Sequence, residues 1–202
     1  MELAMTRENF WKYIAEAHKK EKDNNGRMNY LVEKLSNKSY EEIFSFGIIV
    51  DEIMLESYNQ KLWCASYLLN GETREESFDF FRLWLISQGE KIYNDVMKNP
   101  DNLIKYVDEP DEDFISDLYE NEDFFFVAVD AFGIKNDMGI FEELFEIYLE
   151  KFDSYKEKLN YNDEDYPKLK LTWCEKVPKS MKKICPKLFE RFYIGEDEYT
   201  RN

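Results

Sequence analysis

Apolar residues recur at helical spacing in at least five segments of the chain, and this periodicity is the strongest constraint on its fold. The clearest pattern lies in residues 141–152, where six large apolar residues fall on one side of an expected helix: Phe141, Leu144, Phe145, Tyr148, Leu149 and Phe152. Residues 43–54 repeat the pattern with Ile43, Phe46, Val50, Ile53 and Met54. These segments predict amphipathic helices that bury one face.

One run, residues 124–129, has strand character because it is continuously apolar. Its helical phase continues through Ala131 and Phe132, and the chain offers no second strong strand with which it could pair. With only seven Gly and five Pro, the chain also has few residues for the turns of a β-sandwich. We therefore predict an all-α fold of about eight helices with an aromatic-rich core, formed by a single domain over residues 1–202.

Several helix ends have recognisable signals. Thr6 can cap a first helix, Ser39 and Glu42 form a capping box, and Asn70 followed by Gly71 is a typical C-terminal stop. Pro186 suits the first position of a last helix. Residues 19–27 and 155–178 are predicted to be loops, with Trp173 anchoring the second of them.

The charge of the chain is concentrated in one quarter of it. Residues 101–150 hold sixteen Asp or Glu against two Lys, whereas residues 166–194 are mildly basic, and the net charge of the chain is −16. Such an acidic segment repels nucleic acid and acidic membrane surfaces and attracts cationic partners. We therefore expect a basic protein partner, no nucleic acid and no membrane, while the oligomeric state stays open. Internal pairing of the acidic and basic segments is an alternative.

Most catalytic motifs are missing from the sequence. His18 is the only histidine, which excludes HExxH zinc sites, and no phosphate-binding glycine loop occurs. Four acidic residues, Asp108, Asp111, Asp113 and Asp117, are spaced loosely enough to suggest a cation or partner site. The spacing is not that of an EF-hand, so we expect a charged surface, no metal and no cofactor.

Cellular location and thiol state are suggested by simple features. Met1 to Arg7 lack the apolar run of a signal peptide, and the apolar runs are far shorter than a membrane span. Cys64, Cys174 and Cys185 form no CxxC pair, which favours reduced, buried thiols. These features predict a cytoplasmic protein.

Arg82 is unusual because it sits among aromatic residues. Asp79 lies three residues earlier, on the same side of the expected helix, so the two can form a buried ion pair with the guanidinium stacked on a ring. The alternative is a binding pocket with Arg82 facing a carboxylate or phosphate ligand. Further residues that could border it are Trp63, Tyr67, Asn70 and Trp84.

Three motifs carry a resemblance to a known family: Phe10-Trp11-x-x-Ile14, Leu62-Trp63-x-x-Ser66-Tyr67-x-x-Asn70-Gly71, and Phe78-x-x-Phe81-Arg82-x-Trp84-Leu85-Ile86-x-x-Gly89. Together they resemble DUF4240, a family of bacterial proteins that is catalogued as a domain of unknown function. The resemblance spans most of the chain and implies an α-helical fold, but it implies no mechanism. Asp79, Arg82 and Trp84 fall in its most distinctive motif.

Two functions are compatible with these observations. The first is a non-enzymatic interaction module with an acidic face, such as an immunity or antitoxin-like protein that neutralises a basic toxin or nuclease. The second is an enzyme or small-molecule sensor with a pocket around Trp63, Tyr67, Arg82 and Trp84. We favour the first, because the chain lacks a nucleophile and base set.

Overall fold

The computed structural model is built of helices and contains no β-strand within residues 2–71, 74–108, 119–138 and 142–193, the part of the chain that it describes. In these ranges there are ten α-helices and one 3-10 helix, η1: α1 (Arg7–Lys20), α2 (Asn24–Ser36), α3 (Tyr40–Ser57), α4 (Gln60–Asn70), α5 (Glu75–Ser87), α6 (Glu90–Lys98), η1 (Pro100–Lys105), α7 (Asp123–Lys135), α8 (Glu142–Leu159), α9 (Pro178–Ile184) and α10 (Pro186–Phe192). The all-α prediction is confirmed, but about eight helices was too few.

The helix ends show which capping signals in the sequence predicted a helix boundary correctly. The Thr6 side chain caps α1, and Ser39 and Glu42 form the expected capping box of α3. The loop predicted for residues 19–27 is wrong, since α1 continues to Lys20 and α2 already begins at Asn24. The reason is Asp23, whose carboxylate accepts a hydrogen bond from the Gly26 backbone at 2.8 Å and caps α2.

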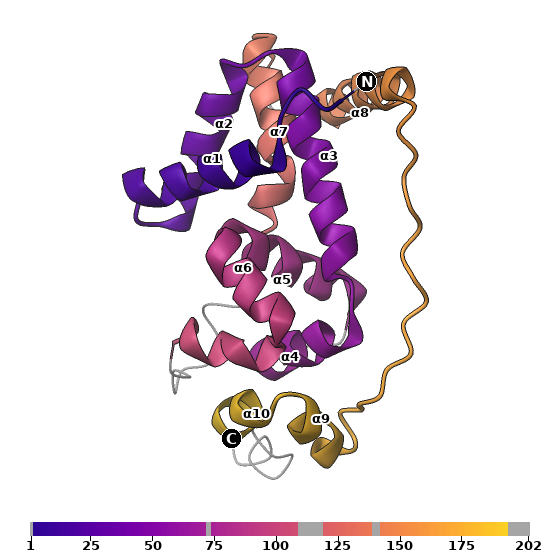
Figure 1. The fold of residues 1–202 in the computed structure, drawn as a ribbon. Coiled ribbons are helices and arrows are strands. Elements are labelled where there is room, and N and C mark those ends of the chain that lie inside the picture. Colours follow the sequence, from indigo (N-terminus) through magenta and orange to yellow (C-terminus); the bar gives the residue numbers. More distant parts are fainter. Residues whose placement is uncertain (1, 72–73, 109–118, 139–141, 194–202) are drawn as a thin grey trace.

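Helices α1, α2, α7 and α8 gather beside one part of α3, while α4, α5 and α6 lie toward its other end, with α9 and α10 beyond them (Figure 1). Helix α7 packs against α2, α3 and α8, while α4 packs against α5, α9 and α10. Between α8 and α9 the chain has no helix, and Figure 1 shows this segment running along the outside of the molecule. We call residues 160–177 the strap. None of the described helices is long and apolar enough to cross a membrane.

Aromatic rings form much of the core, as predicted. Phe10, Phe46 and Phe124 join α1, α3 and α7, with ring centroids 4.8 to 6.4 Å apart. A second cluster joins α3, α7 and α8 and consists of Phe44, Phe132, Tyr148, Phe152 and Tyr155. This second cluster fixes α8 on α3 and thereby positions one wall of the candidate site.

Candidate functional site

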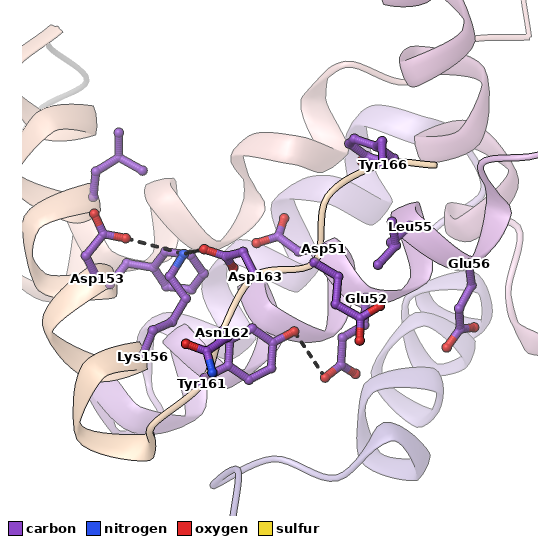
Figure 2. Close-up of a pocket in the computed structure, with 13 residues that line it drawn as sticks. Asp51, Glu52, Leu55, Glu56, Asp153, Lys156, Tyr161, Asn162, Asp163 and Tyr166 are labelled. Atoms are coloured by element: carbon purple, nitrogen blue, oxygen red, sulfur yellow. Dashed lines mark hydrogen bonds and ion pairs between the residues drawn. The ribbon is translucent and has the colours of Figure 1, made fainter. Parts of the chain in front are cut away.

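An open groove of about 580 Å³ lies between α3, the second half of α8 and the beginning of the strap (Figure 2). Six carboxylates and one lysine line it, together with aromatic and aliphatic side chains. The lining residues are Asp51, Glu52, Leu55, Glu56, Leu149, Phe152, Asp153, Lys156, Tyr161, Asn162, Asp163, Glu164 and Tyr166. The groove is therefore both concave and strongly acidic.

Close packing of two helices creates this groove. The buried face of α3 includes Ile53 and Met54, while Asp51 and Glu52 lie on its other side in the groove. Gly47, one turn earlier on α3, allows α8 to approach, because a Cβ atom at this position would lie 2.6 Å from the Tyr148 hydroxyl oxygen. That approach brings the end of α8 alongside the carboxylates of α3.

Lys156 organises one side of the groove. Its Nζ lies 3.3 Å from Asp153 Oδ1 on the same helix and 2.9 Å from Asp163 Oδ2 on the strap (Figure 2). On the opposite side the Tyr161 hydroxyl donates to Glu52 Oε1 at 3.4 Å. These contacts tie the beginning of the strap to both helices. Glu56 also pairs with Arg7 from α1, yet two cations cannot neutralise six carboxylates.

The surroundings of Asp51 raise its pKa to about 6. Its side chain remains open to water, but protein encloses it on several sides, and this partial desolvation is the main cause. Lys156 lowers the pKa of Asp51, and the neighbouring carboxylates of Asp163 and Glu52 raise it. Burial, with further contributions from Glu52, Asp51 and Asp163, also raises the pKa of Tyr161, to about 12. Asp51 is thus a carboxylate whose charge depends on pH near 6.

Metal binding is not indicated by the groove. Among the described residues, no group of three or more His, Cys, Asp or Glu is arranged to hold a metal ion. The mixture of carboxylates with Leu55, Phe152 and Tyr166 fits a different ligand. Carboxylates can pair with a guanidinium or ammonium group while the apolar side chains cover the aliphatic stem that carries it.

Arg82 lies outside the groove and is completely buried. Its guanidinium donates to Asp79 Oδ1 and to the Met54 carbonyl oxygen, and its carbon lies 4.8, 5.0 and 5.2 Å from the ring centres of Phe78, Tyr58 and Tyr166. The predicted ion pair with Asp79 is present. The pKa of Asp79 is raised because partial burial outweighs the opposing effect of Arg82, so the ion pair does not fully offset the desolvation of its carboxylate.

The other residues of the predicted pocket fall into two groups. Trp63 stacks on Phe78 at 4.8 Å, beside Arg82, and its buried Nε1 has no hydrogen-bond partner among the described residues. Asn70 and Trp84 both contact Tyr119. The Asn70 side chain forms two hydrogen bonds with the Tyr119 backbone, and the Trp84 ring makes an edge contact with the Tyr119 ring at 5.0 Å. Tyr67 contacts Trp173 of the strap at 5.7 Å. None of these residues lines the acidic groove.

The acidic segment predicted as the binding face contributes little to the groove. Asp108 is exposed, and its backbone N–H donates to the Tyr119 hydroxyl at 3.1 Å. The predicted site residues Asp111, Asp113 and Asp117 lie outside the described residues. Asp101 is buried and accepts hydrogen bonds from the Lys187 and Leu188 backbones at 2.9 and 3.0 Å. Asp101 of the acidic segment therefore caps α10 through backbone N–H groups, a contact that is not an ion pair with the basic side chains of the C-terminal region.

Comparison with known proteins places the chain in a family. No curated protein and no solved structure matches it. A family model described as "Protein of unknown function (DUF4240)" matches residues 5–133, which extend from the loop before α1 almost to the end of α7. The α3 wall of the groove and the Arg82 motif lie inside this match, whereas α8 and the strap lie beyond it. The chain belongs to the DUF4240 family.

Proposed function

We propose that this protein is a non-enzymatic interaction module that captures a basic protein, as an immunity or antitoxin-like protein does with a basic toxin or nuclease. The observation that carries the proposal is the groove itself, which has a volume of about 580 Å³ and is lined by six carboxylates and one lysine. Complementary charge mainly accelerates encounter and selects the partner.

The residues that line the groove indicate which side chains of a partner could bind there. Its apolar lining, which includes Leu55, Phe152 and Tyr166, lies beside the acidic groups. A partner segment with Arg or Lys side chains can place its cationic groups on the carboxylates and its aliphatic stems on this apolar surface. We therefore assign the groove, rather than residues 101–150, as the docking surface for the basic partner.

A charge-neutralising double variant tests this assignment. Asp51→Asn with Glu164→Gln removes two groove charges at residues that hold no ion pair or hydrogen bond in the described structure. The matched control is Glu33→Gln with Glu175→Gln, which removes two exposed charges outside the groove. Binding of a fluorescent arginine-rich peptide is measured by anisotropy at low and at high salt.

We expect the groove variant to weaken peptide binding about tenfold at low salt, because removing two nearby charges costs on the order of 1 kcal/mol or more. The control should change binding much less, and salt should weaken binding to the unmodified protein. Equal losses in the groove variant and the control would show that only net charge matters, which would refute the docking surface.

A further inference from the structure

A second concave site lies across α8 from the acidic groove. It has a volume of about 300 Å³ and is formed by the beginning of α3, the end of α7 and the second half of α8. The α8 residues that line it are Lys151, Ser154, Tyr155 and Lys158, which lie on the opposite face of the helix from those that line the groove. We call this site the aromatic pocket.

Four aromatic side chains line the pocket: Tyr40, Phe44, Phe132 and Tyr155. The last three are buried, and the Phe44 ring lies 5.9 Å from Phe132 and 5.6 Å from Tyr155 between ring centres. The Tyr155 hydroxyl shares a hydrogen bond with the buried Ser45 hydroxyl at 2.9 Å, which fixes its ring. A pocket of this size, with rings already held in place, fits a flat aromatic group of one or two rings.

Asn136 places a hydrogen-bond donor beside these rings. Its Oδ1 accepts from the Tyr40 hydroxyl at 2.8 Å, and its Nδ2 donates to the Phe132 carbonyl oxygen at 2.7 Å. These two contacts orient the amide and leave its second N–H without a partner among the described residues. The pocket therefore offers this donor to a ligand.

The charged side chains of the pocket favour an anion. Lys151 pairs with Glu150 at 2.8 Å, whereas Lys158 has no ion pair within the described part of the chain. Glu41 is the only carboxylate among the described residues that line the pocket. The lining thus carries a net charge of +1, in a protein whose net charge is −16. Such a lining suits a ligand with one negative charge.

We propose that the aromatic pocket is a binding site for small aromatic carboxylates. The ring of the ligand lies among the buried aromatic side chains, and its carboxylate accepts hydrogen bonds from the Asn136 amide and the Lys158 ammonium group. The acidic groove repels the same ligand, so the two faces of α8 select small molecules of opposite charge.

A titration followed by nuclear magnetic resonance tests the proposal. Nitrogen-15-labelled protein is titrated with β-naphthoate and, separately, with β-naphthamide, a neutral compound of nearly the same shape. We expect saturable shifts of the Asn136 side-chain amide and of the backbone amides of Phe132 and Tyr155. For β-naphthoate the dissociation constant should be on the order of 1 mM or below. β-Naphthamide should bind about fivefold more weakly, because it lacks the negative charge.

Variants at exposed positions separate the charge from the shape of the pocket. Lys158→Gln should weaken β-naphthoate binding about fivefold and leave β-naphthamide binding nearly unchanged. The matched control is Lys170→Gln, which removes an exposed lysine of the strap and should change neither affinity. Ser154→Phe places a ring in the pocket from an exposed position, so it should abolish the saturable shifts with both compounds.

Four results would overturn the proposal: no saturable binding at millimolar concentrations, equal affinity for the acid and the amide, shifts that map to another region, or full β-naphthoate affinity in a folded Ser154→Phe variant. The spectrum without ligand reports whether each variant is folded. The peptide titration of the acidic groove uses other residues, so either proposal can fail without the other.

Discussion

Tyr166 contacts both the acidic groove and the Arg82 cluster, which consists of Arg82, Asp79, Tyr58, Phe78 and Tyr166. The two regions differ in how far their charged groups are buried and paired. Arg82 is a single cation enclosed by three rings, a carboxylate and a backbone carbonyl. The groove holds six carboxylates against one lysine and remains open to water. In the first region the cation is paired within the protein, although its Nε has no hydrogen-bond partner among the described residues, whereas the second region leaves negative charge available to another molecule.

Because of this difference, we expect the Arg82 cluster to affect the stability of the protein and the groove to affect its binding to a partner. Removing a buried, paired cation strands its partners in the protein interior, which is costly. Removing one of several solvated carboxylates relieves repulsion and costs little stability. Variants in the Arg82 cluster should therefore change unfolding, and variants in the groove should change the capture of a basic partner.

The largest effect is expected from Arg82→Ala. The change removes one of two side-chain donors to the Met54 carbonyl, the other being the Ser57 hydroxyl, and leaves a cavity among Tyr58, Phe78 and Tyr166. We expect the free energy of unfolding to fall by about 3–5 kcal/mol, measured by urea titration. Asp79→Ala should also be strongly destabilising, because it leaves the guanidinium without its carboxylate.

The double variant of Arg82 and Asp79 completes a thermodynamic cycle. Since the two residues share one ion pair, the double variant should lose less stability than the sum of the two single variants. If the changes in the free energy of unfolding were near zero and additive, the ion pair would contribute nothing to stability. The Arg82 cluster would then not differ from the groove in its effect on unfolding.

Local signals in the sequence were sufficient for much of the fold. The Asp79 and Arg82 pair was predictable because a spacing of three places both on one side of a helix. The capping box at Ser39 identified the beginning of α3 in the same way. Helix α9 was missed because it has seven residues, too few for a periodic pattern, although Pro178 stands at its first turn.

The candidate site could not be predicted, because tertiary packing creates it. Its walls come from residues 51–56, 149–156 and 161–166, and the last of these lies in a segment read as a loop. Average charge drew attention to residues 101–150 instead. One signal was present: Gly47 lies within an otherwise large-residue helix and marks where α8 approaches α3.

A smaller effect is expected from Gly47→Ala, which tests how the groove is built. The new methyl group would lie 2.6 Å from the Tyr148 hydroxyl oxygen and 3.2 Å from a Phe152 ring carbon, so these side chains, or α8 with them, must shift. Overpacking should outweigh the better helix propensity of Ala and lower the free energy of unfolding by about 1–2 kcal/mol. Adding Tyr148→Phe should restore part of the loss, and a lack of restoration would contradict this packing.

Tyr166→Ala probes the residue that both regions share. The Tyr166 ring packs against Tyr58 at 4.6 Å in a tilted arrangement and contacts the Arg82 guanidinium, but about half of its surface is exposed. We expect a loss of about 1 kcal/mol in chemical denaturation. Tyr166→Phe keeps the ring and serves as the control, so similar losses in both variants would show that the ring contacts are not the cause.

Asp51→Asn should have the smallest effect on stability, with a defined dependence on pH. Folding raises the pKa of Asp51 from 3.8 to about 6, so the folded protein binds this proton more tightly than the unfolded chain. The resulting stabilisation is fully present below about pH 4 and is lost as the pH rises through 6. Because the side chain is open to water, we expect the amide variant to be more stable than the unmodified protein by only a few tenths of a kcal/mol at pH 7, with the advantage disappearing below pH 4. Urea midpoints at pH 4, 6 and 7 measure this. An advantage that stayed constant over that range would mean that Asp51 titrates normally and that the groove does not hold its charges close together.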